Sequence, residues 1–300
     1  MRLVLASRSA AYLALFRAIA SNRLPSQRRY LFHDPYAKYF LPPALRMVAN
    51  LSAIPGLNYA ISKILDTRFA GALTSCLART RLIDVMVLET IHNYGINQLI
   101  IFGASYDCRI HRLDFNPKDQ KTKVQFVEID HPYLQEAKRE VLEHLKNKPK
   151  ELIDYIPVDF SNQQLETTIP HHLFKEHYKT LLIWEGVTNS LTIPIADKLF
   201  QYFSKFTSGT RIIFIYIDEK VLTHTQSFLG TAISPKELRQ QQEFWNFGMA
   251  PSKMKQFLAG YNMELLYDVD ADTYRHTSFG KSADKLNGLE YYRVVMAVVK

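Results

Sequence analysis

Four short apolar segments of this 300-residue chain each end at a glycine or an acidic residue. A glycine at such a position lets backbone N–H groups approach a ligand closely, and a carboxylate accepts hydrogen bonds from hydroxyl or amino groups. In an open parallel α/β sheet, ligands bind outside the carboxyl ends of the strands. The four residues, in chain order, are Gly103, Asp130, Asp159 and Glu185. Their types predict a pocket for a cofactor that carries a nucleoside.

The loop after the first segment argues against a dinucleotide. It contains a single glycine, Gly103, where a pyrophosphate site has the pattern G-x-G-x-x-G. Asp130 follows the second segment, where a carboxylate can accept both ribose hydroxyls; a helix N-cap before Pro132 is an equally good interpretation. Asp159 can accept from an exocyclic amine while Phe160 packs on the base, although a loop-start aspartate is the favoured interpretation of Asp159 taken alone. The pattern as a whole is more specific than any one of these residues.

The four residues can meet at one site only if the segments before them are neighbouring strands of one sheet. Residues 96–300 do alternate between strand and helix patterns. Such alternation predicts an α/β fold with a mostly parallel sheet and right-handed crossovers. A polar, helical insertion near residues 219–250 interrupts it, as either a lid or a surface helix. We expect strands near residues 98–102, 124–129, 154–158, 181–184, 211–217, 264–268 and 291–299, with helices at 131–148, 195–206 and 254–261.

Residues 1–95 read as mainly helical, and we expect them to form an N-terminal cap integrated with a core of residues 96–300. The clearest helix covers residues 82–94, with Gly95 as its C-cap, and Asp34 is a candidate N-cap. Residues 1–33 contain no acid and six arginines, a composition that resembles a transit peptide. A helix near residues 7–20 that belongs to the folded protein is the preferred interpretation.

Bulk composition is that of an ordinary globular protein, with 47% hydrophobic and 22% charged residues. Cys76 and Cys108 make no disulfide framework and have no metal-ligand spacing, which suits a reducing compartment and predicts a cytoplasmic protein without a metal. No apolar stretch is long enough to span a membrane. The net charge of +8 is read as a solvated basic surface, and no nucleic-acid partner is expected, because the basic residues are not concentrated in one run.

The segments around these strand ends resemble the leucine carboxyl methyltransferase-like group of S-adenosylmethionine-dependent methyltransferases. The family run G-A-G-x-D-x-R-x-x-R-L is similar to residues 103–113, Gly-Ala-Ser-Tyr-Asp-Cys-Arg-Ile-His-Arg-Leu. The family patterns E-x-D-x-P, V-D-L and E-G-L are similar to residues 128–132, 158–160 and 185–187. Three further family patterns have counterparts upstream: R-T-x-x-x-D at residues 79–84, A-x-x-R-A at 14–18 and D-P-x-A at 34–37. The resemblance covers roughly residues 8–217.

The resemblance implies a class I, Rossmann-like seven-stranded sheet with an antiparallel last strand, and S-adenosylmethionine as cofactor. It further implies that Arg79, or failing that Arg81, binds the methionine carboxylate, and that Glu185 lies near the amino group. The remaining implied roles are Gly103 at the methionine part, Asp130 at the ribose, and Asp159 with Phe160 at the adenine.

The chain departs from the family pattern at two places. Ser105 replaces the second glycine, and residues 187–190 replace a more apolar stretch that should face the methyl acceptor. We expect O-methylation of a small molecule or a protein. A carboxylate is the preferred acceptor, and a hydroxyl is the second choice. No general base is selected among the histidines His33, His92, His111 and His131. A nicotinamide-dependent oxidoreductase and an inactive cofactor-binding regulatory protein are the alternatives.

Overall fold

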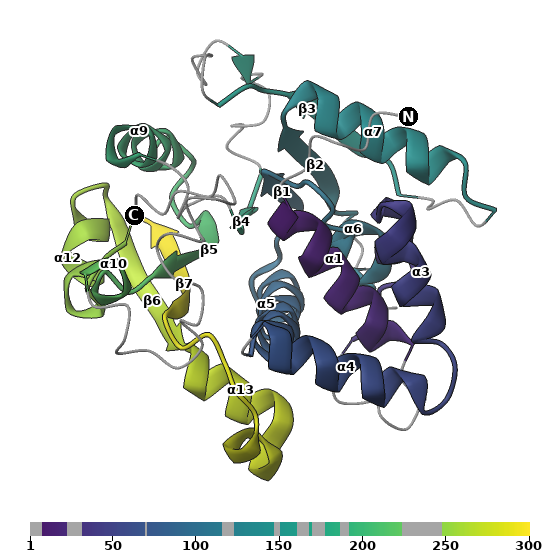
Figure 1. The fold of residues 1–300 in the computed structure, drawn as a ribbon. Helices are drawn as coiled ribbons and strands as arrows, with labels where there is room; N and C mark the ends of the chain where they lie inside the picture. Colours follow the sequence, from purple (N-terminus) through teal and green to yellow (C-terminus); the bar gives the residue numbers. More distant parts are fainter. Residues whose placement is uncertain are drawn as a thin grey trace.

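Seven strands form one sheet in the order β3-β2-β1-β4-β5-β7-β6 (Figure 1). The computed structural model describes residues 8–22, 32–69, 71–115, 123–146, 151–160, 168–169, 178–186, 192–223 and 248–300. Strands β1 to β5 are parallel, and β7 runs antiparallel to both β5 and β6, as predicted. The strands are β1 (Gln98–Phe102), β2 (Gln125–Asp130), β3 (Ile153–Pro157), β4 (Thr180–Trp184), β5 (Arg211–Ile217), β6 (Met263–Asp270) and β7 (Tyr292–Val299).

The register brings the carboxyl ends of four strands to one edge of the sheet. Phe102 pairs with Ile129 of β2 on one side and with Trp184 of β4 on the other. Asp130 pairs with Pro157 at the end of β3. The residues that follow β1, β3 and β4 therefore lie along the same edge as the end of β2.

Side chains of successive strand residues enter two different cores. Ile100 and Phe102 pack on one face of the sheet with residues of α9 (Ile193–Phe203) and α12 (Pro251–Ala259). Leu99 and Ile101 pack on the other face with α5 (Ala72–Tyr94) and α13 (Ala271–Phe279). The result is a sheet between two helical layers (Figure 1), which explains why β1, β4 and β5 read as continuous apolar runs.

The N-terminal helices lie outside α5 (Figure 1). Ala14, Leu15 and Ile19 of α1 (Arg8–Ser21) are buried in a cluster that includes Tyr106 and Cys108 of the loop after β1. The other helices of this region are a 3-10 helix (Ala37–Phe40), α3 (Pro43–Leu51) and α4 (Leu57–Arg68). None of the helices in the described parts of the chain combines the length and apolar character that crossing a membrane requires.

Three helical elements differ from the sequence-based expectation. Helix α5 begins at Ala72, ten residues before the predicted start. Asp34 is not a helix N-cap: Tyr36 precedes the short 3-10 helix, and the Asp34 carboxylate accepts the backbone N–H groups of Tyr36 and Ala37. Helix α7 (Pro132–Glu143) ends before the predicted boundary at residue 148.

The predicted insertion near residues 219–250 is described only in part. It begins with the short helix α10 (Lys220–Thr223), and residues 224–247 lie outside the described residues.

Candidate functional site

The loop after β1 takes a backbone conformation that favours glycine. Gly103 has φ +65°, and its N–H donates to the carbonyl of Ile129 at 2.8 Å. Ser105 also has a positive φ, +42°, which is uncommon for a residue other than glycine. Serine, at the position of the family's second glycine, thus adopts a left-handed conformation in this chain.

Asp130 fixes this loop at the end of β2. One carboxylate oxygen accepts the Ser105 N–H at 2.5 Å and the other accepts the His131 N–H at 2.7 Å. Burial raises the pKa of the Asp130 carboxyl, and these two backbone bonds only partly offset the effect. Because a carboxylate has about four acceptor sites, each oxygen keeps capacity for a ligand hydroxyl. The N-cap alternative holds in part: Asp130 binds the N–H of His131, next to the first residue of α7.

Asp159 and Phe160 follow β3 on the same edge. Asp159 keeps 29% of its side chain exposed, and its Oδ2 lies 4.0 Å from Nε2 of His131. The ring of Phe160 lies 6.4 Å from that of Phe102 and packs against the core. An acceptor and an aromatic side chain are thus adjacent where the sequence predicted an adenine site.

Glu185, directly after β4, is held by two buried arginines. Its Oε1 accepts from Nε of Arg79 at 3.0 Å, and its Oε2 lies 2.7 Å from Nη1 of Arg109. Burial alone would raise the pKa of Glu185, but Arg109 and Arg79 outweigh it and the pKa is lowered. The structure therefore pairs Arg79 with Glu185, two residues that the sequence had assigned to separate ligand groups.

Arg81, the alternative to Arg79, lies elsewhere. Two residues along a helix correspond to a rotation of roughly 200°, so Arg79 and Arg81 point to different sides of α5. Arg81 lines a separate surface cavity of about 390 Å³, together with Phe32, Leu88 and Leu113. The two arginines are not brought together, and Arg79 is the one that reaches the strand-end carboxylates.

A second group of contacts explains the spacing of the charged residues in two of the motifs. Asp84 of α5 binds Nε of Arg109 at 2.8 Å and both terminal nitrogens of Arg112 at 2.6 Å. Arg109 and Arg112 are on the short helix α6 (Arg109–Arg112), three residues apart and thus on one side of it. Asp107 also pairs with Arg109; burial would raise its pKa, but Arg109 lowers it to about 2.

Lys138 of α7 also binds the loop that follows β1. Its amino group binds both carboxylate oxygens of Glu128, at 2.7 and 2.8 Å, and the carbonyl oxygen of Asp107 at 2.5 Å. The side chains of Lys138 and Glu128 are each 1% exposed. Burial lowers the pKa of Lys138, but the Glu128 carboxylate more than reverses this, so Lys138 remains charged.

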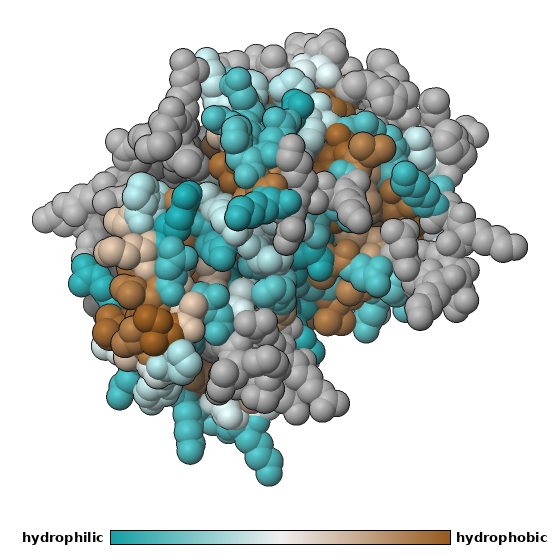
Figure 2. All heavy atoms as spheres, turned by 90° about the vertical axis from the view of Figure 1, so that its right-hand side faces the viewer, coloured by the Kyte–Doolittle hydropathy of each residue, from teal (hydrophilic) through white to brown (hydrophobic). Residues whose placement is uncertain are grey.

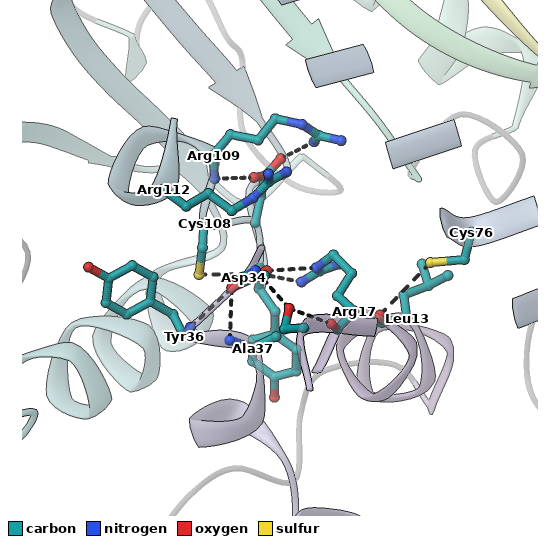
Figure 3. A network of polar contacts seen from close by, with 12 residues as sticks. Leu13, Arg17, Asp34, Tyr36, Ala37, Cys76, Cys108, Arg109 and Arg112 are labelled. Atoms are coloured by element: carbon teal, nitrogen blue, oxygen red, sulfur yellow. Dashed lines mark hydrogen bonds and ion pairs between the residues drawn. The ribbon is translucent and has the colours of Figure 1, made fainter. Parts of the chain in front are cut away.

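The N-terminal helix reaches the loop through Arg17. Its Nε donates to Asp34 at 3.0 Å and its Nη2 donates to the carbonyl of Tyr106 at 2.7 Å. Figure 3 shows Arg17 pointing at the Asp34 carboxylate, which also accepts the N–H groups of Tyr36 and Ala37. The loop is therefore fixed from α1, α5, α7 and the end of β2.

The arrangement can bind a ligand that has both hydroxyl or amino donors and a carboxylate. Asp130 offers a buried acceptor and Asp159 a partly exposed one at the strand edge, and the Arg79–Glu185 pair offers both charges. Arg17, Asp107 and Arg109 lie in the family motifs but had no function assigned to them, and Lys138 lies outside those motifs. The signal of the first three was the motif spacing, but the partners only become visible in the fold.

Comparison with known sequences identifies the family. The profile of the leucine carboxyl methyltransferase family matches residues 10–204, so the chain belongs to that family. A predicted S-adenosyl-L-methionine-dependent methyltransferase of Rhodococcus jostii is 32% identical over 129 residues, which are 43% of this chain and 38% of the relative. Another, from Mycobacteroides abscessus, is 26% identical over 186 residues, 61% of this chain and 57% of the relative. The chain thus spans only about two fifths to three fifths of these relatives.

Solved structures confirm the fold class. A duf574 family protein from Streptomyces avermitilis superposes with a TM-score of 0.55 at 10% identity, covering 98% of both chains. A protein from Thermobifida fusca, described as a predicted methyltransferase, gives a TM-score of 0.51 at 12% identity over 82% of this chain and 89% of its own. At these identities the similarity establishes the class I methyltransferase fold alone.

Proposed function

We propose that this protein is an S-adenosylmethionine-dependent methyltransferase that methylates an oxygen, with a carboxylate as the preferred acceptor and a hydroxyl as the second. Family membership and the names of the relatives from Rhodococcus jostii and Mycobacteroides abscessus support the cofactor. The single observation that carries the proposal is the common strand edge. There, Asp130 is bonded to a left-handed loop at Gly103 and Ser105, beside the Arg79–Glu185 pair.

The chemistry of the donor set fits this cofactor. S-adenosylmethionine combines two ribose hydroxyls and an adenine amine with an amino acid. Asp130 supplies a buried carboxylate for the hydroxyls, and burial raises its pKa more than its backbone hydrogen bonds lower it. Asp159 supplies an acceptor for the amine and Phe160 an aromatic surface, while the loop at Gly103 offers backbone N–H groups.

The charged pair at the end of β4 is suited to the amino acid part of the cofactor. Arg79 donates to Glu185 through Nε, and a guanidinium carries four further N–H donors. Those donors suit a carboxylate, and the Glu185 carboxylate suits an ammonium group. Arg109 holds Glu185 in place from the other side.

When bound, the cofactor supplies a methyl group already activated by its sulfonium sulfur. The task of the protein is then to align donor and acceptor and to exclude water. A carboxylate acceptor needs no proton removed, whereas a hydroxyl acceptor calls for a base. His111 is buried and its pKa is lowered to about 4, chiefly by burial, so its imidazole is neutral at pH 7. This histidine packs against Tyr36 and lines the surface cavity that contains Arg81, so we do not assign it to the cofactor.

Isothermal titration calorimetry with S-adenosylmethionine, S-adenosylhomocysteine and NAD tests the cofactor. Asp130→Ala should weaken binding of the first two by about 1–3 kcal/mol, roughly 5- to 150-fold, through loss of charge-assisted hydrogen bonds. Asp154→Ala is the matched control, because this exposed carboxylate lies near the amino end of β3, away from the site. Binding of NAD alone, or unchanged affinity in a folded Asp130→Ala variant, would refute the assignment.

The acceptor is tested separately. Transfer of a radiolabelled methyl group to small carboxylic acids, phenols and peptide carboxyl termini distinguishes the acceptor classes. Esters formed with carboxylates hydrolyse in mild base, whereas methyl ethers do not. Base-stable products alone would refute a carboxylate acceptor while leaving the methyltransferase proposal intact.

A further inference from the structure

Exposed apolar side chains gather on α3, α4 and the turn between them. Among the described residues, thirteen large hydrophobic side chains are exposed, and six of them fall within an 18-residue stretch. The six are 41% to 73% exposed, and we call them the α3–α4 apolar face: Met47, Leu51, Ile54, Leu57, Tyr59 and Ile64. Figure 2 views the molecule from the side of α3 in Figure 1 and shows hydrophobic atoms gathered between hydrophilic ones.

The turn at the centre of this face has no exposed polar side chain, since its one polar residue, Ser52, is buried. Residues 53–57, Ala-Ile-Pro-Gly-Leu, are all exposed. Helix α4 contains no buried residue, although it contacts α5 and α3. Contiguous exposed apolar surface on a soluble domain marks an interaction site, because leaving it in water costs free energy.

Basic residues outnumber acids in the part of the sequence that contains this face, and in the described residues 32–69 they are Lys38, Arg46, Lys63 and Arg68. Residues 1–68 contain ten lysines and arginines and two acids, Asp34 and Asp66, for a net charge of +8. That equals the net charge of the whole chain, so residues 69–300 are balanced at 27 basic and 27 acidic residues.

Neither acid offsets the positive surface fully. The Asp34 side chain is 0% exposed and is paired with Arg17. Asp66 is half-buried, burial raises its pKa, and its carboxylate accepts a long hydrogen bond from Thr74 at 3.4 Å. On α4, Lys63 and Arg68 are exposed beside Ile64.

We propose that the α3–α4 apolar face docks on the surface of an anionic lipid bilayer. Apolar side chains at a helical turn with basic residues beside them are typical of helices that lie in a membrane interface. Each basic residue close to an anionic surface contributes about 1 kcal/mol of attraction, which falls off within a Debye length. A protein partner is the alternative occupant, and the vesicle experiment below distinguishes it from a bilayer. This inference is independent of the proposed methyltransferase activity.

Vesicle co-sedimentation tests the proposal with the full chain. We expect binding to vesicles of phosphatidylcholine mixed with phosphatidylserine, weaker binding to phosphatidylcholine alone, and release by high salt. Ile54→Asp and Leu57→Asp should each reduce binding at least about tenfold, because a charge replaces a side chain that would enter the interface. Ile193→Asp is the matched control: Ile193 is 66% exposed at the start of α9, away from the face, and should retain binding.

Circular dichroism will check that the variants are folded. We expect them to fold, because the substituted side chains are exposed. Absence of sedimentation with phosphatidylserine vesicles would overturn the proposal. So would equal binding of Ile54→Asp and the wild type, or equal binding to vesicles with and without phosphatidylserine. A dimer in light scattering that Ile54→Asp dissociates, without vesicle binding, would assign the face to a second copy of the chain instead.

Discussion

Replacing Lys138 by methionine should destabilise the protein strongly. The substitution leaves Glu128 fully buried without its cation and removes the N–H donor from the carbonyl of Asp107. Removing one partner of a buried ion pair costs about 3–5 kcal/mol, a large part of the roughly 5–15 kcal/mol that holds a domain folded. The size follows from burial, since both side chains are 1% exposed. Equilibrium urea unfolding measures the loss at pH 7.

The double variant Lys138→Met with Glu128→Leu separates the charge effect from packing. Replacing both members by apolar residues should return most of the lost stability, because no unpaired charge remains. Lys253→Met is the matched control. Lys253 is 67% exposed in its pair with Glu219, and its loss should change stability by less than about 0.5 kcal/mol.

The pH dependence provides a second criterion. In the wild type burial raises the pKa of Glu128, and Lys138 opposes this; without Lys138 the pKa rises further. A carboxyl with a raised pKa in the folded state contributes stability that is present below its unfolded pKa and is lost as the pH rises. The destabilisation by Lys138→Met should therefore grow from about pH 4 to pH 7. A loss below about 1 kcal/mol at pH 7, or one independent of pH, would refute the reasoning.

Two further predictions concern single residues. Burial, with a smaller effect of Lys138, lowers the pKa of His111 from 6.5 to about 4, so the stability from its neutral form is present above pH 6.5 and falls by about 3 kcal/mol toward pH 4. His111→Phe should flatten the unfolding free energy over this range, and an unchanged slope would contradict the assignment. Ser105→Gly should stabilise the protein by about 1 kcal/mol in chemical denaturation, because glycine adopts φ +42° without strain. Ser105→Ala keeps the strain, so an equal gain in that control would show that φ is not the cause.

The ends of the central strands could be predicted because the residues that mark them are neighbours in the sequence. Each central strand is a continuous apolar run that stops at the residue expected to face a ligand, and the register then follows from parallel pairing. Gly103, Asp130 and Glu185 accordingly lie on one edge. The specific roles of the site residues remain predictions until a ligand is measured.

The first half of α5 could not be predicted in the same way. Thr74, Ser75, Arg79 and Thr80 are all buried there, so the contrast between an apolar and a polar side that marks a helix in sequence is weak. Two of these polar residues bind distant groups: Ser75 accepts the N–H of Leu289, and Arg79 binds Glu185, 106 residues away. A pairing of that separation leaves no periodic trace in the sequence.

The arginine-rich composition of the N-terminus fits a transit peptide, but a helix of the folded protein is the preferred interpretation of the sequence. The structure packs α1 against the loop after β1, and Arg17 joins Asp34 to the carbonyl of Tyr106. Loss of α1 would leave Asp34 buried without its cation and would free the loop that carries Gly103. We therefore propose that residues 1–95 and 96–300 act as one unit, in which the N-terminal helices hold the ligand loop in shape.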